Sequence, residues 1–151
     1  AAEIVATDIA DAPLAIAKKL GATETVNTAS RPTAFDGWKA DKGHFDVLFE
    51  ASGNQQALVS AFDVLRPGAV IVQVGLGGDM TLPINTIVAK EFQLRGTFRF
   101  DREFELAVRL LAEKLIDVTP LITATLPFAS AVEAFELAGD RSQSMKVQLA
   151  F

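Results

Sequence analysis

Short apolar segments alternate with helix-like segments along most of the chain, and this alternation restricts the fold more than any other feature. Apolar runs rich in β-forming residues occupy 3–8, 45–51 and 69–74, and a weaker one occupies 24–27. Near-continuous apolar strands that alternate with helices are typical of a parallel sheet covered by helices on both faces. We therefore predict an α/β fold.

Local signals bound the first two helices. The first is predicted to start at Asp11 as its N-cap and to stop at Gly21, where the missing side chain suits a left-handed residue. The second has Asn54 as its candidate cap and Pro67-Gly68 as its terminator.

The second half of the chain continues the alternation after a looser segment that follows Gly78. Residues 92–98 are predicted to form a strand, at the edge of the sheet, and 102–115 carry apolar residues at helical spacing. Beyond them we expect strand, helix and strand at 121–128, 131–138 and 146–151.

Charge and composition exclude several classes of function. The net charge of −5 argues against a nucleic-acid partner, because such a partner normally requires a basic face. The chain has no cysteine and only one histidine, His44, so it offers no thiolate metal site and little for a metal cluster. Charged residues interrupt every apolar run before it reaches membrane-spanning length, so no membrane partner is expected.

The amino-terminal residues, Ala-Ala-Glu-Ile-Val, contain neither an initiating methionine nor a targeting signal. We therefore expect a cytoplasmic protein, and a fragment of a longer one.

Asp8 is the most informative single residue. An acidic side chain at the end of the second strand of a dinucleotide-binding fold can accept both ribose hydroxyls of the adenosine half, although Asp8 or Asp11 could simply cap the following helix. The glycine-rich phosphate loop that should precede such a residue by about 20 positions would lie before residue 1. The glycines at 75, 77 and 78 do not replace it, because Met80 stands where the third glycine would be.

Several motifs in order and at fixed spacing resemble the medium-chain, zinc-dependent alcohol and polyol dehydrogenases, and within them the sorbitol and L-idonate dehydrogenase group. They include Val5-Ala-Thr-Asp8, Phe45-Asp-Val-Leu-Phe-Glu-Ala-Ser-Gly53, Arg66-Pro-Gly68, Val74-Gly-Leu76 and Leu94-Arg-Gly-Thr-Phe-Arg-Phe100. The resemblance covers essentially the whole chain. It implies a Rossmann-type, doubly wound parallel sheet, here without its first strand and phosphate loop.

The resemblance also implies a set of cofactor contacts. Asp8 would bind the adenosine ribose beside Ile9 and would favour NAD over NADP, because its carboxylate repels a 2′-phosphate. The nicotinamide carboxamide would be held by backbone groups of residues 74, 97 and 99, and Arg99 could also reach the substrate. The complete set of cofactor residues is Asp8, Ile9, Ala51, Ser52, Gly53, Val74, Gly75, Leu76, Thr97, Phe98, Arg99 and Lys146.

By the same resemblance, residues 1–100 are a partial NAD-binding domain and 101–151 a segment that returns to the catalytic domain. No residue of the chain can be assigned as a zinc ligand or a catalytic group, so zinc is expected in the full-length enzyme only, and these residues alone should be inactive. The substrate class would be a polyol or sugar acid, and homodimers would join through strand 92–98.

The missing first strand leaves three structural alternatives. The strands at 3–8 and 45–51 could pair directly, another chain could fill the slot, or an upstream peptide could supply it. Three other functions remain open: an NADPH-dependent quinone reductase of the same superfamily, a methyltransferase-like domain, and a non-catalytic assembly module.

Overall fold

The structure is a computed structural model that describes residues 1–140 and 142–151. The chain divides into two compact units, one formed by residues 1–32 with 102–151 and the other by residues 33–101. Each unit is described by itself.

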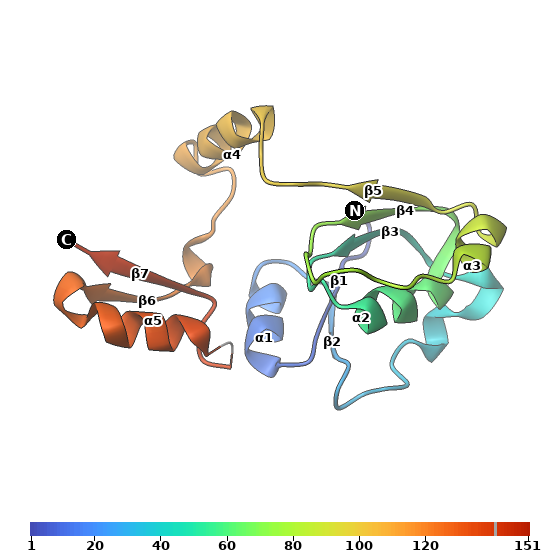
Figure 1. Ribbon diagram of the computed structural model, residues 1–151, viewed down its shortest axis with the longest axis horizontal. Coiled ribbons are helices and arrows are strands. Elements are labelled where there is room, and N and C mark those ends of the chain that lie inside the picture. The colour runs from blue at the N-terminus through green and yellow to red at the C-terminus, as the bar shows by residue number, and fades with distance from the viewer. Residues whose placement is uncertain (141) are drawn as a thin grey trace. The chain divides into compact units, whose positions relative to one another are not determined.

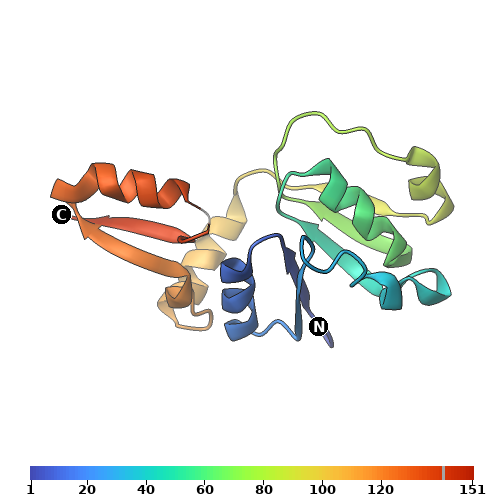
Figure 2. The ribbon, with the colours of Figure 1, turned by 90° about the horizontal axis from the view of Figure 1, so that it is seen from below.

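The amino-terminal part of the first unit is a strand–helix–strand element. Strand β1 (Val5–Asp8) pairs in parallel with β2 (Glu24–Asn27), and α1 (Asp11–Lys19) connects them (Figure 2). Leu14 of α1 and Val26 of β2 are buried, so the helix packs its apolar side on the strands.

The ends of α1 match the prediction only in part. Gly21 follows the helix with φ of +107°, which supports the predicted stop. The N-cap position is held by Ala10 rather than Asp11, and no side chain caps it. Asp11 lies in the first turn instead, where its carboxylate accepts a hydrogen bond of 2.6 Å from the Asn27 amide. The predicted cap was therefore wrong by one position.

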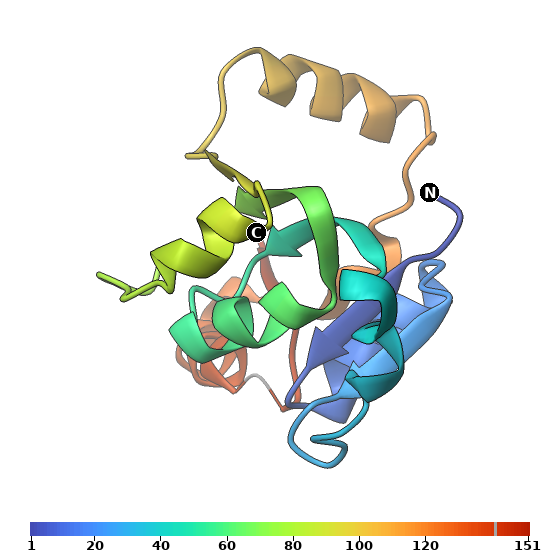
Figure 3. The same ribbon diagram turned by 90° about the vertical axis from the view of Figure 1, so that its right-hand side faces the viewer.

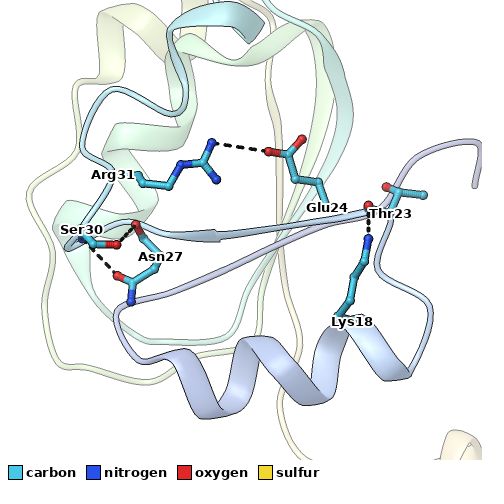
Figure 4. A network of polar contacts seen from close by, with 6 residues as sticks. All are labelled: Lys18, Thr23, Glu24, Asn27, Ser30 and Arg31. Atoms are coloured by element: carbon cyan, nitrogen blue, oxygen red, sulfur yellow. Dashed lines mark hydrogen bonds and ion pairs between the residues drawn. The ribbon is translucent and has the colours of Figure 1, made fainter.

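A network of exposed polar side chains ties the ends of this element together (Figure 4). Lys18 Nζ donates to the Thr23 carbonyl at 2.6 Å, and Arg31 lies 3.8 Å from the Glu24 carboxylate. Asn27 Oδ1 accepts the backbone N–H of Ser30 at 3.2 Å and so closes the turn after β2. Exposed ion pairs of this kind stabilise a fold only weakly, so burial of Val26 and Leu14 matters more.

The carboxyl-terminal part of the first unit repeats this plan. Helix α4 (Arg102–Ala112) is followed by β6 (Ile122–Pro127), α5 (Ala131–Gly139) and β7 (Lys146–Ala150), and β6 and β7 pair in parallel. Helix α5 packs along this strand pair through the buried Ala134 (Figure 1). Helix α4 was predicted to extend to residue 115 but ends at Ala112. Lys114, just beyond this end, adopts a left-handed conformation.

The second unit is a three-stranded parallel sheet in the order β3-β4-β5 (Figures 1 and 3). Its strands are β3 (Phe45–Glu50), β4 (Leu65–Gln73) and β5 (Gln93–Gly96), and its helices are α2 (Gln55–Ser60) and α3 (Ile84–Ala89). One buried cluster joins α2, the turn after it and the sheet, and it consists of Leu58, Phe62, Leu65, Ala69, Ile71 and Phe92. Short 3₁₀ turns complete the chain at Asp36–Trp38, Ala40–Lys42, Ala61–Asp63, Thr119–Leu121 and Phe128–Ser130.

Strand β4 begins earlier than predicted because the chain passes Pro67-Gly68 inside the strand. The pairing register shifts between Phe45↔Leu65 and Val47↔Val70, so the irregular stretch absorbs the proline. The preceding helix has Asn54 as its cap, as predicted, with its side chain accepting two backbone N–H bonds, but it ends at Ser60. Helix α3 falls in the segment predicted to be loose, because six residues are too few to show a helical period.

Lys90 fastens the beginning of β4. Its ammonium donates to the carbonyls of Leu65 at 2.7 Å and Phe62 at 2.8 Å, and to that of Lys42 at 3.0 Å. These carbonyls come from three different segments, so one cation links these segments at the amino-terminal end of β4.

Among the described residues, β1 is paired with β2, and β3 is paired with β4. None of the described helices is both long enough and apolar enough to cross a membrane.

Candidate functional site

Two turns meet at the carboxyl ends of β3 and β4. Gly53, in the turn after β3, is buried and has φ of +68°, and a Cβ added there would lie 2.7 Å from the carbonyl carbon of Leu76. A Cβ on Gly75 would collide with the Gly53 nitrogen, and one on Gly77 with the Gly53 oxygen. The glycines therefore allow two backbone segments to touch.

The buried carboxylate of Glu50 lies between these turns. Oε1 accepts the Ser52 N–H at 2.8 Å and also the Ser52 hydroxyl, and Oε2 accepts the Gly53 N–H at 3.0 Å. From β4, the Gln73 amide donates to Oε2 at 2.5 Å and to the Gly75 carbonyl at 2.9 Å. Only 4% of Glu50 is exposed, so a charged group is kept inside the protein by donors from the turn after β3 and from Gln73 of β4.

The hydrogen bonds determine the ionisation of Glu50. Burial raises the pKa of its carboxyl, but the bonds from the Ser52 hydroxyl, the Gly53 and Ser52 N–H groups and Gln73 together outweigh burial and hold the pKa below its ordinary value of 4.5. Glu50 is therefore ionised at neutral pH.

This shift predicts a pH-dependent stability. The pKa of Glu50 is lower in the folded state than in the unfolded state. Its contribution to the free energy of unfolding is therefore fully present above the unfolded pKa of 4.5 and is lost as the pH falls through the lower folded pKa. Urea unfolding of the wild type and of Glu50→Gln is expected to show a stability difference that shrinks on acidification from about pH 7 to about pH 3. A difference that stays constant over that range would contradict the assignment.

Backbone N–H groups in the turns after β4 and β5 are engaged within the protein. The N–H groups of Val74 and Gly75 both donate to the Glu50 carbonyl, at 2.8 and 2.9 Å, and the N–H of Thr97 donates to the Gln73 carbonyl at 3.1 Å. With these donors engaged, Val74 and Thr97 can contribute backbone acceptors but not donors. Such acceptors suit an amide NH₂ group.

The segment after β5 is exposed and carries the remaining predicted residues of this unit. Arg99 has φ of +56°, and its guanidinium lies 5.0 Å from the centre of the Phe98 ring, a cation–π distance. Phe98 and Leu76 are 68% and 78% exposed, which leaves two large apolar side chains for a ligand ring.

Asp8, Ile9 and Lys146 belong to the other unit. Asp8 ends β1, and its Oδ1 accepts the backbone N–H of Ala10 at 2.9 Å. This bond is a local turn contact before α1 and not a helix cap, and it engages one of the two carboxylate oxygens. Ile9 is 75% exposed, and Lys146 is an exposed residue at the start of β7.

No metal centre is formed by the residues that the structure describes. They include no cluster of three or more His, Asp or Glu side chains that could hold an ion, and His44 stacks edge-on against Phe45 with ring centres 4.8 Å apart. The described residues therefore do not fit a zinc site.

The sequence patterns did not indicate the roles of Glu50 and Gln73, and neither residue is among the predicted site residues. The available signal was a polar residue at the last position of each of two apolar strands, a position where side chains of a parallel sheet converge. Gln73 Oε1 is buried without a hydrogen-bond partner among the described residues.

Known proteins that are similar to this chain in sequence include polyol and sugar-acid dehydrogenases. L-Idonate 5-dehydrogenase (NAD(P)(+)) from Escherichia coli K-12 is 45% identical over 152 residues, which cover 100% of this chain and 44% of that protein. Sorbitol dehydrogenase from Gallus gallus is 33% identical over 153 residues, covering 99% and 43%. The chain therefore spans less than half the length of these relatives.

The crystal structure of the E. coli L-idonate 5-dehydrogenase matches with a TM-score of 0.93 at 45% identity, covering 100% of this chain and 43% of that one. The predicted fold class and resemblance are thus confirmed. The profile of the family described as zinc-binding dehydrogenases matches residues 1–113. The chain belongs to the zinc-binding dehydrogenase family.

Proposed function

We propose that these residues form the NAD-binding part of a dehydrogenase that oxidises a secondary alcohol of a polyol or sugar acid. The observation that carries this proposal is the contact between the turns at 51–53 and 74–77. These turns present backbone acceptors and exposed apolar side chains at the carboxyl ends of the parallel strands. Ligands of open α/β sheets bind at these ends.

The nicotinamide half would lie at the turns after β4 and β5. The carbonyls of Val74 and Thr97 would accept the carboxamide NH₂, and Gly75 and Leu76 would contact the ring. Arg99 follows these residues in the sequence, and its guanidinium would bind a substrate oxygen. When bound, the nicotinamide accepts a hydride, and the residues of this chain orient its ring.

The adenosine half would use Ala51, Ser52, Gly53, Asp8 and Ile9, and Lys146 would lie toward the pyrophosphate. The free oxygen of the Asp8 carboxylate would accept a ribose hydroxyl. A 2′-phosphate would meet the same carboxylate, so NAD is favoured over NADP.

Substitution of Asp8 tests this preference. Asp8→Ser should shift the ratio of NADP⁺ to NAD⁺ affinity toward NADP⁺ by roughly tenfold or more, because the repulsive charge is removed. Titration of both nucleotides against the wild type and the variant measures the shift. Asp11→Ser is the matched control, since Asp11 is an acidic residue already bonded to Asn27, and it should leave the ratio unchanged. An equal shift in both variants would contradict a specific role for Asp8.

We propose that the full-length protein, and not these 151 residues alone, binds the substrate and the zinc. We infer a substrate of the L-idonate or sorbitol class from the two relatives reported above, and zinc bound by residues beyond these 151, because the chain spans less than half of either relative. These residues alone should therefore not turn over the alcohol.

The deciding experiment is a turnover assay of the full-length protein with L-idonate and with sorbitol, in the presence of NAD⁺ or NADP⁺. We expect reduction of NAD⁺ that stops when zinc is removed by a chelator and returns when zinc is added. A full-length wild-type protein that does not bind NADH would refute the proposed function.

Two further proposals concern assembly and location. Strand β5 lies at the edge of its sheet and all four of its residues are exposed, which supports homodimers joined through residues 92–98. Sedimentation of the full-length protein would measure this. A cytoplasmic location is proposed as well, and fractionation of cells would test it.

A further inference from the structure

Glu50 connects the two halves of the candidate site. Its side chain binds the turn after its own strand through Ser52 and Gly53, and its backbone carbonyl accepts the N–H groups of Val74 and Gly75 from the turn after the neighbouring strand β4. Gln73 closes the link by donating to both the carboxylate and the Gly75 carbonyl. One residue therefore contacts each of the two turns by several bonds.

The donors around Glu50 require an ionised carboxylate. Two backbone N–H groups, a hydroxyl and an amide all point at its two oxygens, and among the described residues no cation forms an ion pair with it. An amide in the same place would offer only one oxygen and would turn an NH₂ group toward donors. The arrangement therefore depends on the charge and not only on the shape of the side chain.

We propose that Glu50 is a positioning residue that sets the spacing between the turns at 51–53 and 74–77, and through it the placement of the backbone carbonyls that receive the nicotinamide carboxamide. This rests on the proposed function. Glu50 itself would not touch the cofactor, because its two oxygens are occupied by protein donors, and its effect would pass through Gly53 and Gly75.

A fluorescence titration of the full-length protein with NADH tests the proposal in each variant that folds. Glu50→Gln is expected to raise the Kd for NADH roughly tenfold, because one carboxylate oxygen is replaced by a group that repels its neighbours. Glu50→Asp keeps the charge but shortens the side chain, and should recover part of the affinity. In the full-length enzyme, kcat should fall together with the affinity, since a misplaced ring slows hydride transfer.

Lys90→Met is the matched control. Lys90 is also a charged residue that holds several backbone groups of the same sheet, but it acts at the first residue of β4, whereas Glu50 acts at the last. Lys90→Met should lower the stability to urea and leave the Kd for NADH within about twofold of the wild type. If it weakens NADH binding as much as Glu50→Gln does, the effect of Glu50 is general destabilisation and the proposal is wrong.

A second variant covers the case in which Glu50→Gln does not fold. Gln73→Leu cuts the link between Glu50 and Gly75 and leaves the bonds from Ser52 and Gly53 in place, and it should raise the Kd roughly threefold or more. Wild-type affinity in folded Glu50→Gln, or in Gln73→Leu when only that variant folds, would overturn the positioning role while the proposed function stands. No NADH binding by the wild type would overturn both.

Discussion

Replacing Gly75 with alanine is expected to abolish NADH binding and to lower the free energy of unfolding by about 3 kcal/mol. The added Cβ would collide with the backbone nitrogen of Gly53 and would lie 2.8 Å from Glu50 Oε2. Because the nearest atoms belong to the backbone and to a hydrogen-bonded carboxylate, they cannot move aside as a flexible side chain would. The two turns must separate, and the bonds of Glu50 break with them.

Gly37→Ala is the control for the general effect of adding a methyl group to a glycine. A Cβ on Gly37 has no heavy atom within 4 Å, and the residue lies in the same unit as Gly75. We expect a change in stability within about 0.5 kcal/mol and no change in the Kd for NADH. The measurements are urea unfolding and NADH titration, and a Gly75→Ala variant as stable as Gly37→Ala would show that the turns are not in the close contact described.

Phe62→Ala is expected to destabilise the second unit by about 3 to 5 kcal/mol. The Phe62 side chain is 2% exposed, and its ring meets that of Phe92 edge-on with centres 5.3 Å apart. Truncation leaves a cavity in the cluster that joins α2 to the sheet, and a loss of this size is a large part of the stability of a typical domain. Thermal and urea unfolding would both detect it.

Phe49→Ala makes the same chemical change on strand β3, where the side chain is 70% exposed. Its expected cost is below about 1 kcal/mol, because little apolar surface is withdrawn from water at that position. Equal costs for Phe49→Ala and Phe62→Ala would mean that the core does not lie where the structure places it.

Local sequence patterns predicted the order of the main elements because each pattern is produced by the residues of the element itself. The apolar run at 45–51 became β3, Asn54 became the cap of α2, and Gly21 ended the segment after α1 in a left-handed conformation. The patterns failed where another part of the chain decides. Pro67 lies inside β4 because the pairing register with β3 shifts there, and a single sequence window does not contain both strands.

The candidate site shows the same division. Asp8 and the glycines at 53 and 75 could be selected from the sequence, because residue type and position at a strand end are visible there, although their roles in cofactor binding stay predictions. Glu50 and Gln73 could not be understood in the same way, since they are 23 positions apart and their bond exists only when β3 and β4 lie side by side. The family resemblance did not reveal them either.

The sequence by itself therefore determined the α/β class, the parallel strands and the family, because hydrophobic period, turn residues and motif spacing are local or one-dimensional properties. The tertiary structure alone decided that Gly53 and Gly75 touch and that a buried carboxylate joins their turns. Contact between distant segments depends on the register and packing of whole strands, and the free energy that selects one arrangement is a sum over many residues that no single motif contains.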